Sequence, residues 1–166
     1  GVEIRVLFDS MGCRGMKNSD WDRLEKAGIQ VAEFFPAVLG KLQLRVNYRN
    51  HRKIAVIDGR IGFVGGFNIG REYLGKDEKF GYWRDTHICI EGAAVTSLAV
   101  RFALDWNYAA RDNIFLEDHL FELPTYIRNG RDPVQIISSG PDSHSQEIRN
   151  NYLRLIHMAR KNIFIQ

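Results

Sequence analysis

Apolar and polar residues alternate in two short stretches near the start of the chain, residues 2–8 and 29–34. Alternation with a period of two is typical of β-strands that bury one face. The segment between them has apolar residues at helical spacing. It begins at Ser19 or Asp20, both favoured helix N-caps, and ends at Gly28. The order strand, helix, strand predicts a β-α-β unit with a parallel pair of strands.

Residues 50–68 contain two apolar-rich segments that flank the pair Asp58-Gly59. An Asp-Gly pair supplies both left-handed residues of a two-residue type I′ turn, so this stretch predicts a β-hairpin. A turn of that kind pairs Ile57 with Arg60 and thereby fixes the register of the whole ladder.

His51 and Lys53 precede this turn in the same predicted strand, where they share a face and lie roughly 7 Å apart. In the predicted register His51 faces Gly66, and Gly65 and Gly66 leave the space over the imidazole free of side chains. Asn68 adds an amide donor at the rim. An imidazole, an ammonium and an amide around an open patch favour a phosphate site with histidine as nucleophile or acid.

Further along the chain, spacing and composition predict the remaining elements. They are a strand over residues 86–90, a long amphipathic helix over 94–106 with its aromatic residues in the core, an irregular connector over 114–132, a second amphipathic helix through 148–156 and a strand over 162–166.

His51, Lys53 and Asp58 have the spacing His-x-Lys-x4-Asp, and Gly65-Gly66-Phe67-Asn68 follows six residues later. The pattern resembles the HxKxxxxD motif of the phospholipase D superfamily and its trailing Gly-Ser-x-Asn, with Gly66 in place of the serine. Further segments are similar to bacterial cardiolipin synthases: Asn47 to Lys53, Gly65 to Gly70, Phe34-Phe35-Pro36 and Trp83-Arg84-Asp85-Thr86-His87.

This resemblance implies an α/β fold, a phospholipase D-like mixed sheet flanked by helices, in which two similar halves share one cleft. By resemblance, residues 1–132 are most of the first half and residues 133–166 begin the second. The chain starts and ends on apolar strand-like segments and has a single His-x-Lys, so we expect an incomplete fragment of a longer protein.

For the chemistry, the resemblance implies that one motif histidine attacks phosphorus to form a phosphohistidine while its counterpart protonates the leaving alkoxide. His51 can take either role. The implied reaction joins two phosphatidylglycerol molecules into cardiolipin and releases glycerol, with no metal or other cofactor. The implied partners are the phospholipid, a second half in the same chain or in a second protomer, and the bacterial membrane through parts outside this chain. We expect the 166 residues alone to be soluble and to have little or no turnover.

Four more residues near the motif are candidates for the site. Asp58 belongs to the motif but lies on the opposite face from His51, which favours a turn or scaffold role. Asp85 is the candidate carboxylate that fixes the histidine tautomer, by analogy with other histidine nucleophiles. Arg49 shares the face of His51 and is a candidate for the lipid phosphate, whereas Arg52 is expected outside the pocket.

Three other features are interpreted as structural. Phe34-Phe35 is expected to be the buried end of a strand rather than an exposed lip over an active site. His87 is expected to have a structural role. Cys13 and Cys89 lie far apart and form no zinc or disulfide pattern, so we expect two buried or half-buried thiols.

Composition limits the alternatives. The chain is 45% hydrophobic and 26% charged, which is ordinary for one globular domain. Its net charge of +3 comes without a Lys/Arg run, so it suits an anionic substrate and argues against a nucleic-acid partner. No apolar run approaches the roughly 20 residues that span a bilayer. The alternatives are a phosphodiesterase or nuclease of the same superfamily and a non-catalytic interaction domain with a vestigial site.

Overall fold

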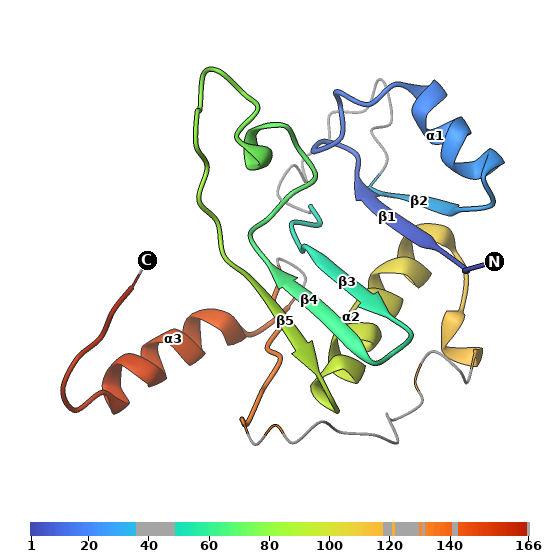
Figure 1. The fold of residues 1–166 in the computed structure, drawn as a ribbon. Coiled ribbons are helices and arrows are strands. Elements are labelled where there is room, and N and C mark those ends of the chain that lie inside the picture. Colours follow the sequence, from blue (N-terminus) through green and yellow to red (C-terminus); the bar gives the residue numbers. More distant parts are fainter. Residues whose placement is uncertain (36–48, 118–120, 122–129, 131, 141–142, 166) are drawn as a thin grey trace.

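One long helix packs against two separate sheets in the computed structural model, which describes residues 1–35, 49–117, 121, 130, 132–140 and 143–165 (Figure 1). The helix is α2 (Ala94–Ala110). One sheet is a parallel strand pair and the other is antiparallel with three strands. The predicted α/β class is therefore confirmed, with parallel and antiparallel pairing both present.

The parallel pair forms the predicted β-α-β unit. It consists of β1 (Arg5–Asp9), α1 (Asn18–Lys26) and β2 (Gln30–Phe34), and Arg5 pairs with Gln30 at the start of the ladder. Helix α1 begins one residue before the predicted cap. The alternating pattern thus identified the fold of this region, and the carboxyl end of β1 brings Asp9 towards the predicted site.

The antiparallel sheet contains the predicted hairpin in a shifted register. Its strands are β3 (Ile54–Ile57), β4 (Ile61–Gly65) and β5 (His87–Glu91). Asp58 and Gly59 have positive φ angles of 50° and 62°, as a type I′ turn requires. The ladder nevertheless pairs Ile57 with Ile61 rather than with Arg60. The predicted register is therefore wrong by one residue.

The same shift changes the placement of the motif. The first ladder pair joins Ile54 to Val64, so His51 and Lys53 precede β3 and do not face glycines across a hairpin. The cause is a pair of long-range hydrogen bonds: the backbone N–H of Asn50 donates to Asp9 and its side-chain amide donates to Asp105. These bonds draw the segment away from the sheet.

Helix α2 joins the two sheets through two apolar clusters. Its first half buries Val95 and Leu98 against Ile90 of β5, and its second half buries Ala103 and Trp106 with residues of the parallel pair and of η2 (Ile114–Leu116). The prediction of an amphipathic helix with Trp106 in the core is confirmed. Each large buried apolar side chain contributes roughly 1.5–3 kcal/mol, so these clusters stabilise the base of the site.

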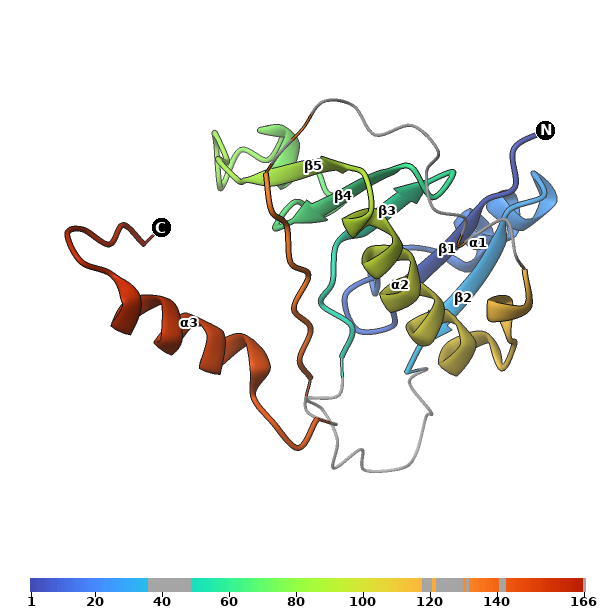
Figure 2. The same cartoon turned by 90° about the horizontal axis from the view of Figure 1, so that it is seen from below.

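The C-terminal part of the chain has few packed residues. Helix α3 (Glu147–Met158), predicted as amphipathic, has no buried residue and extends away from the rest of the molecule in both views (Figures 1 and 2). Residues 162–165 form no strand, so that prediction is wrong for the described part: a strand needs a neighbouring backbone, and none lies beside these residues among those described. Most of the predicted connector, together with Pro36, Asn47 and Tyr48, lies outside the described residues.

Two smaller features complete the fold. A single 3-10 turn, η1 (Glu72–Leu74), interrupts the connection between β4 and β5. Cys13 is half-buried as predicted, but Cys89 is exposed, because it lies on the outer face of β5. The structure therefore corrects the expected burial of one of the two thiols.

Candidate active site

The two motif side chains that the sequence placed together are in contact. The Lys53 Nζ atom lies 3.0 Å from His51 Nδ1 and donates to the His51 carbonyl oxygen at 2.8 Å. An ammonium can only donate, so Nδ1 is the acceptor and the proton of a neutral ring is on Nε2. In that tautomer the free lone pair of the ring is the one on Nδ1 that faces Lys53.

The charge state of Lys53 depends on its surroundings. Burial lowers the pKa of its ammonium below the ordinary value, and the positive charge of Arg49 acts in the same direction. The carboxylates of Asp85 and Asp9 oppose this effect and raise the pKa. Three charged groups from separate segments are thus near enough to Lys53 to influence its protonation.

Gly65 and Gly66 make room for the segment that enters β5, not for the face of His51. A Cβ at Gly65 would lie 2.7 Å from the Cα of His87, and a Cβ at Gly66 would lie 2.8 Å from Oδ2 of Asp85. The prediction that these glycines leave open space over the imidazole is therefore wrong. Gly66 instead leaves space for the Asp85 carboxylate.

Asp85 is positioned by the backbone that follows it. Its Oδ1 accepts the N–H of Thr86 at 2.6 Å. Among the hydrogen bonds of the described residues, none joins Asp85 to His51. The structure thus places the Asp85 carboxylate beside Gly66 and near enough to Lys53 to affect its charge. Its bond to the imidazole stays a prediction.

A polar network that the sequence did not predict holds the residues on either side of His51. Asp105 of α2 is 5% exposed and accepts hydrogen bonds from Arg101 at 2.5 Å, from Arg52 at 3.1 Å and from the Asn50 amide at 3.2 Å. A signal was present: this charged residue comes seven positions after buried Leu98, on the apolar side of the helix.

Asp9 holds the same segment from the end of β1. It accepts hydrogen bonds from Arg49 at 2.8 Å and from the backbone N–H groups of Gly12 and Asn50 at 2.8 and 3.0 Å. Burial alone would raise the pKa of the Asp9 carboxyl, but these hydrogen bonds outweigh it and hold the pKa below its ordinary value. Asp9 is therefore kept as a carboxylate.

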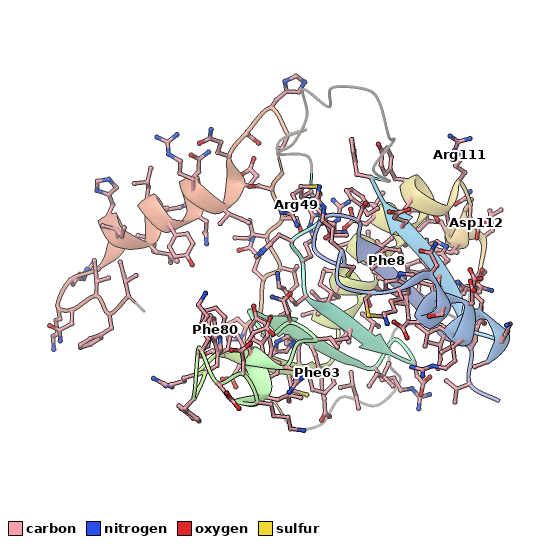
Figure 3. All side chains as sticks on the ribbon, turned by 90° about the horizontal axis from the view of Figure 1, so that it is seen from above. Phe8, Arg49, Phe63, Phe80, Arg111 and Asp112 are labelled. Carbon is pink, nitrogen blue, oxygen red and sulfur yellow. The ribbon has the colours of Figure 1, made fainter. Side chains whose placement is uncertain are left out.

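A cavity of about 860 Å³ lies beside this arrangement, and Asp105 lines it whereas Asp9 and Asp85 do not. One wall is mainly basic and contains Arg49, His51, Arg52, Lys53 and Arg101, with Asp105 paired to Arg52 and Arg101. Figure 3 shows Arg49 between the N-terminal β-α-β unit and the segment that leads to α3. Arg52 was expected outside the pocket but lines it, because its bond to Asp105 draws it towards α2.

The cavity also has an apolar wall. Phe34 and Phe35 line it and are half-buried, so the prediction of a fully buried strand end is corrected. Four predicted site residues are absent from the lining: Asp85 and Gly66, which meet each other at the start of β5, and Asn68 and Asp58. Asn68 donates to the Tyr73 hydroxyl, and Asp58 is exposed at the hairpin turn.

Comparison with known proteins identifies the family. A family model described as "Cardiolipin synthase, PLD-like domain" matches residues 1–106. The chain belongs to this family. The matched range includes His51, Lys53, Asp85 and Asp105 and ends at Trp106 near the end of α2. The expectation of a phospholipase D-like fold is thereby confirmed.

Curated relatives are similar over the full chain. A cardiolipin synthase of Oceanobacillus iheyensis is 49% identical over 166 residues, which are 100% of this chain and 34% of the relative. A cardiolipin synthase of Staphylococcus aureus is 51% identical over 167 residues, or 33% of its length, and one of Listeria innocua is 47% identical over 34%. The chain thus spans about a third of the length of these cardiolipin synthases.

Within residues 1–35, 49–117 and the shorter described segments, no group of three or more His, Cys, Asp or Glu side chains has the arrangement of a metal site. In the same part of the chain no helix has the length and apolar character needed to cross a bilayer.

Proposed function

We propose that this chain is the part of a phosphatidyltransferase that contains one of its two HxKxxxxD motifs. The longer enzyme joins two phosphatidylglycerol molecules into cardiolipin and releases glycerol. The observation that supports this proposal is the contact between Lys53 and His51 on the basic wall of a cavity, in a chain of the cardiolipin synthase family.

The proposed reaction has two displacements at phosphorus. In the first, an imidazole nitrogen bonds to phosphorus, the P–O bond to glycerol breaks, and the second histidine gives its proton to the leaving alkoxide. In the second, the hydroxyl of another phosphatidylglycerol gives its proton to that histidine and attacks, and the P–N bond breaks. Lys53 and Arg49 stabilise the negative charge on the phosphoryl oxygens.

His51 and its counterpart share these two roles, and the proposed second half supplies the counterpart. We propose that residues 133–166 begin that half, which is completed in the same polypeptide or by a second protomer. Helix α3 supports this division, because none of its residues is buried against the part of the chain that the structure describes. Contact with the bacterial membrane is assigned to parts of the enzyme outside residues 1–166.

The main test is His51→Ala in the longer polypeptide, given phosphatidylglycerol vesicles without added metal. We expect cardiolipin formation to fall by about 10³-fold or more, because the reacting nitrogen is lost. Lipid chromatography measures the product. His144→Ala, which removes an exposed histidine outside the cavity lining, is the matched control and should retain activity. Undiminished cardiolipin from His51→Ala would reject the proposal.

A second prediction concerns Asp85, which we propose bonds to Nδ1 once Lys53 has moved to the phosphate. Asp85→Asn should lower kcat of the longer enzyme by about 10- to 100-fold, the usual effect of losing a carboxylate that orients a histidine. Asp85→Glu should restore part of this loss, which a purely structural role does not predict. Equal activity of the Asn and Glu variants would contradict the assignment.

A further inference from the structure

Three aromatic rings meet on the apolar wall of the cavity. The ring centroids of Phe34 and Tyr108 lie 5.4 Å apart, those of Phe34 and Phe35 lie 5.9 Å apart, and those of Phe35 and Tyr108 lie 6.0 Å apart. Phe34 is the last residue of β2, and Tyr108 is in the last part of α2. Two elements that build the fold thus position this cluster beside the motif residues.

The wall remains open to solvent although it is apolar. Tyr108 is 60% exposed, and Leu104, one helical turn earlier on α2, is 45% exposed. Both side chains line the cavity. Leaving large apolar side chains in water forgoes the free energy of their burial, and apolar patches of this kind mark places where a ligand or partner binds.

The backbone at Phe35 adds an independent observation. Its φ angle is 54°, a left-handed conformation that is a genuine outlier for a bulky residue and costs roughly 1–2 kcal/mol. This conformation accompanies the contact between the Phe35 ring and Tyr108, on the side of the cavity. Strain of this kind concentrates at ligand sites.

The two walls together define the chemistry of the ligand. The basic wall suits a phosphate, whereas the aromatic and aliphatic wall suits hydrocarbon and offers little to a free phosphate. The volume of about 860 Å³ lies within the usual range of ligand pockets, roughly 300–1,000 Å³. One molecule that satisfies both walls is an amphiphile with its phosphate next to its apolar chains.

We propose that four cavity residues form a subsite for the acyl chains of the phospholipid, at the end of each chain that is next to the glycerol backbone. The residues are Phe34, Phe35, Leu104 and Tyr108, and the phosphate of the same lipid lies at His51 and Lys53. This inference rests on the proposed function and specifies how that site distinguishes lipid from soluble phosphodiesters. Contact with the chains holds the glycerol backbone in place, and it helps to exclude water from the phosphorus.

The test compares two substrates in the longer polypeptide. Leu104→Gln and Tyr108→Gln change exposed side chains and should leave the fold intact, which circular dichroism checks. We expect kcat/KM for dioleoyl-phosphatidylglycerol vesicles to fall about tenfold or more, because apolar contact with the chains is lost. With monomeric dibutyryl-phosphatidylglycerol the fall should be less than twofold. Leu116→Gln, which removes a 78% exposed leucine outside the cavity, should change neither value.

Each outcome separates this inference from the proposed function. An unchanged preference for long chains in both glutamine variants, or an equal loss on both substrates, overturns the acyl-chain subsite and leaves the assignment of His51 in place. Cardiolipin formation by His51→Ala overturns the proposed function itself. Selective loss on the dioleoyl substrate together with an inactive His51→Ala supports both.

Discussion

The two sides of the segment from Arg49 to Lys53 are held in different ways. On the side of β1 and α2, Asp9 and Asp105 accept hydrogen bonds from Arg49, Asn50 and Arg52 of the segment. On the side of β4 and β5, the segment faces glycine and the Asp85 carboxylate, and no hydrogen bond joins it to Asp85 among the described residues. The hydrogen bonds on the first side fix the position of the segment. On the second side, the Lys53 and His51 side chains are not bonded to Asp85.

The charges on the two sides differ accordingly. The network holds the pKa of Asp9 below its ordinary value and so stabilises the charged form. On the open side, burial lowers the pKa of Lys53 and so destabilises its charged form. A cation that is incompletely compensated in the free protein gains more from a bound anion than one already paired. The asymmetry therefore favours binding an anion at Lys53 rather than at Arg49.

The largest expected effect comes from removing the centre of the network. Asp105→Ala leaves Arg52 and Arg101 without their shared carboxylate, and we expect it to lower the free energy of unfolding of the 166-residue chain by about 2–3 kcal/mol. This is less than a fully buried pair loses, because both guanidinium groups are partly exposed. Urea denaturation followed by circular dichroism measures the change.

The control for that variant is Asp22→Ala, which changes an exposed aspartate of α1 and should alter stability by less than about 0.5 kcal/mol. If Asp105→Ala and Asp22→Ala had the same free energy of unfolding, the Asp105 network would not contribute to the stability of the chain. Asp105→Asn keeps one acceptor and should fall between the two.

Alanine substitutions at Gly65 and Gly66 are expected to have different effects on stability and activity. Gly65→Ala places a Cβ against the backbone of β5, so overpacking should destabilise the chain by roughly 1–3 kcal/mol. Gly66→Ala places a Cβ against the Asp85 carboxylate, which can rotate away at a smaller cost in stability. Gly66→Ala should nevertheless reduce activity of the longer enzyme, because Asp85 moves.

Gly15→Ala is the matched control, since a Cβ there meets no atom within 4 Å. Thermal unfolding of the three variants ranks their stability, and cardiolipin formation ranks their activity. A Gly66→Ala enzyme as active as the Gly15→Ala enzyme would show that the position of Asp85 does not matter.

The same contrast explains what the sequence could predict. Local patterns predicted the β-α-β unit, the hairpin and α2, because propensity and periodicity depend on near neighbours. They also brought His51 and Lys53 together, although the contact arises in a segment before the strand. The network was missed because Asn50 bonds to carboxylates 41 and 55 positions away in the chain. The register was missed because one Asp-Gly turn is compatible with ladders that differ by a residue.

The smallest expected effect concerns Asp9 and tests whether its negative charge contributes to the stability of the folded chain. Because the pKa of Asp9 is lower in the folded chain than its ordinary value of about 3.9, the folded state binds fewer protons than the unfolded state between these two pKa values. The stability from Asp9 is complete above about pH 4 and is lost as the pH falls through the folded pKa. Asp9→Asn should lack this contribution, which we expect to be below about 1 kcal/mol.

Urea midpoints of the wild-type chain and of Asp9→Asn, measured from pH 6 downwards, should therefore converge below about pH 4. Asp22→Asn should run parallel to the wild type throughout, because Asp22 is exposed on α1. A constant difference between Asp9→Asn and the wild type would mean that Asp9 holds Asn50 through hydrogen bonds that do not depend on its charge. The asymmetry between the two sides would then be one of geometry, and the proposed preference of an anion for Lys53 over Arg49 would lose its electrostatic basis.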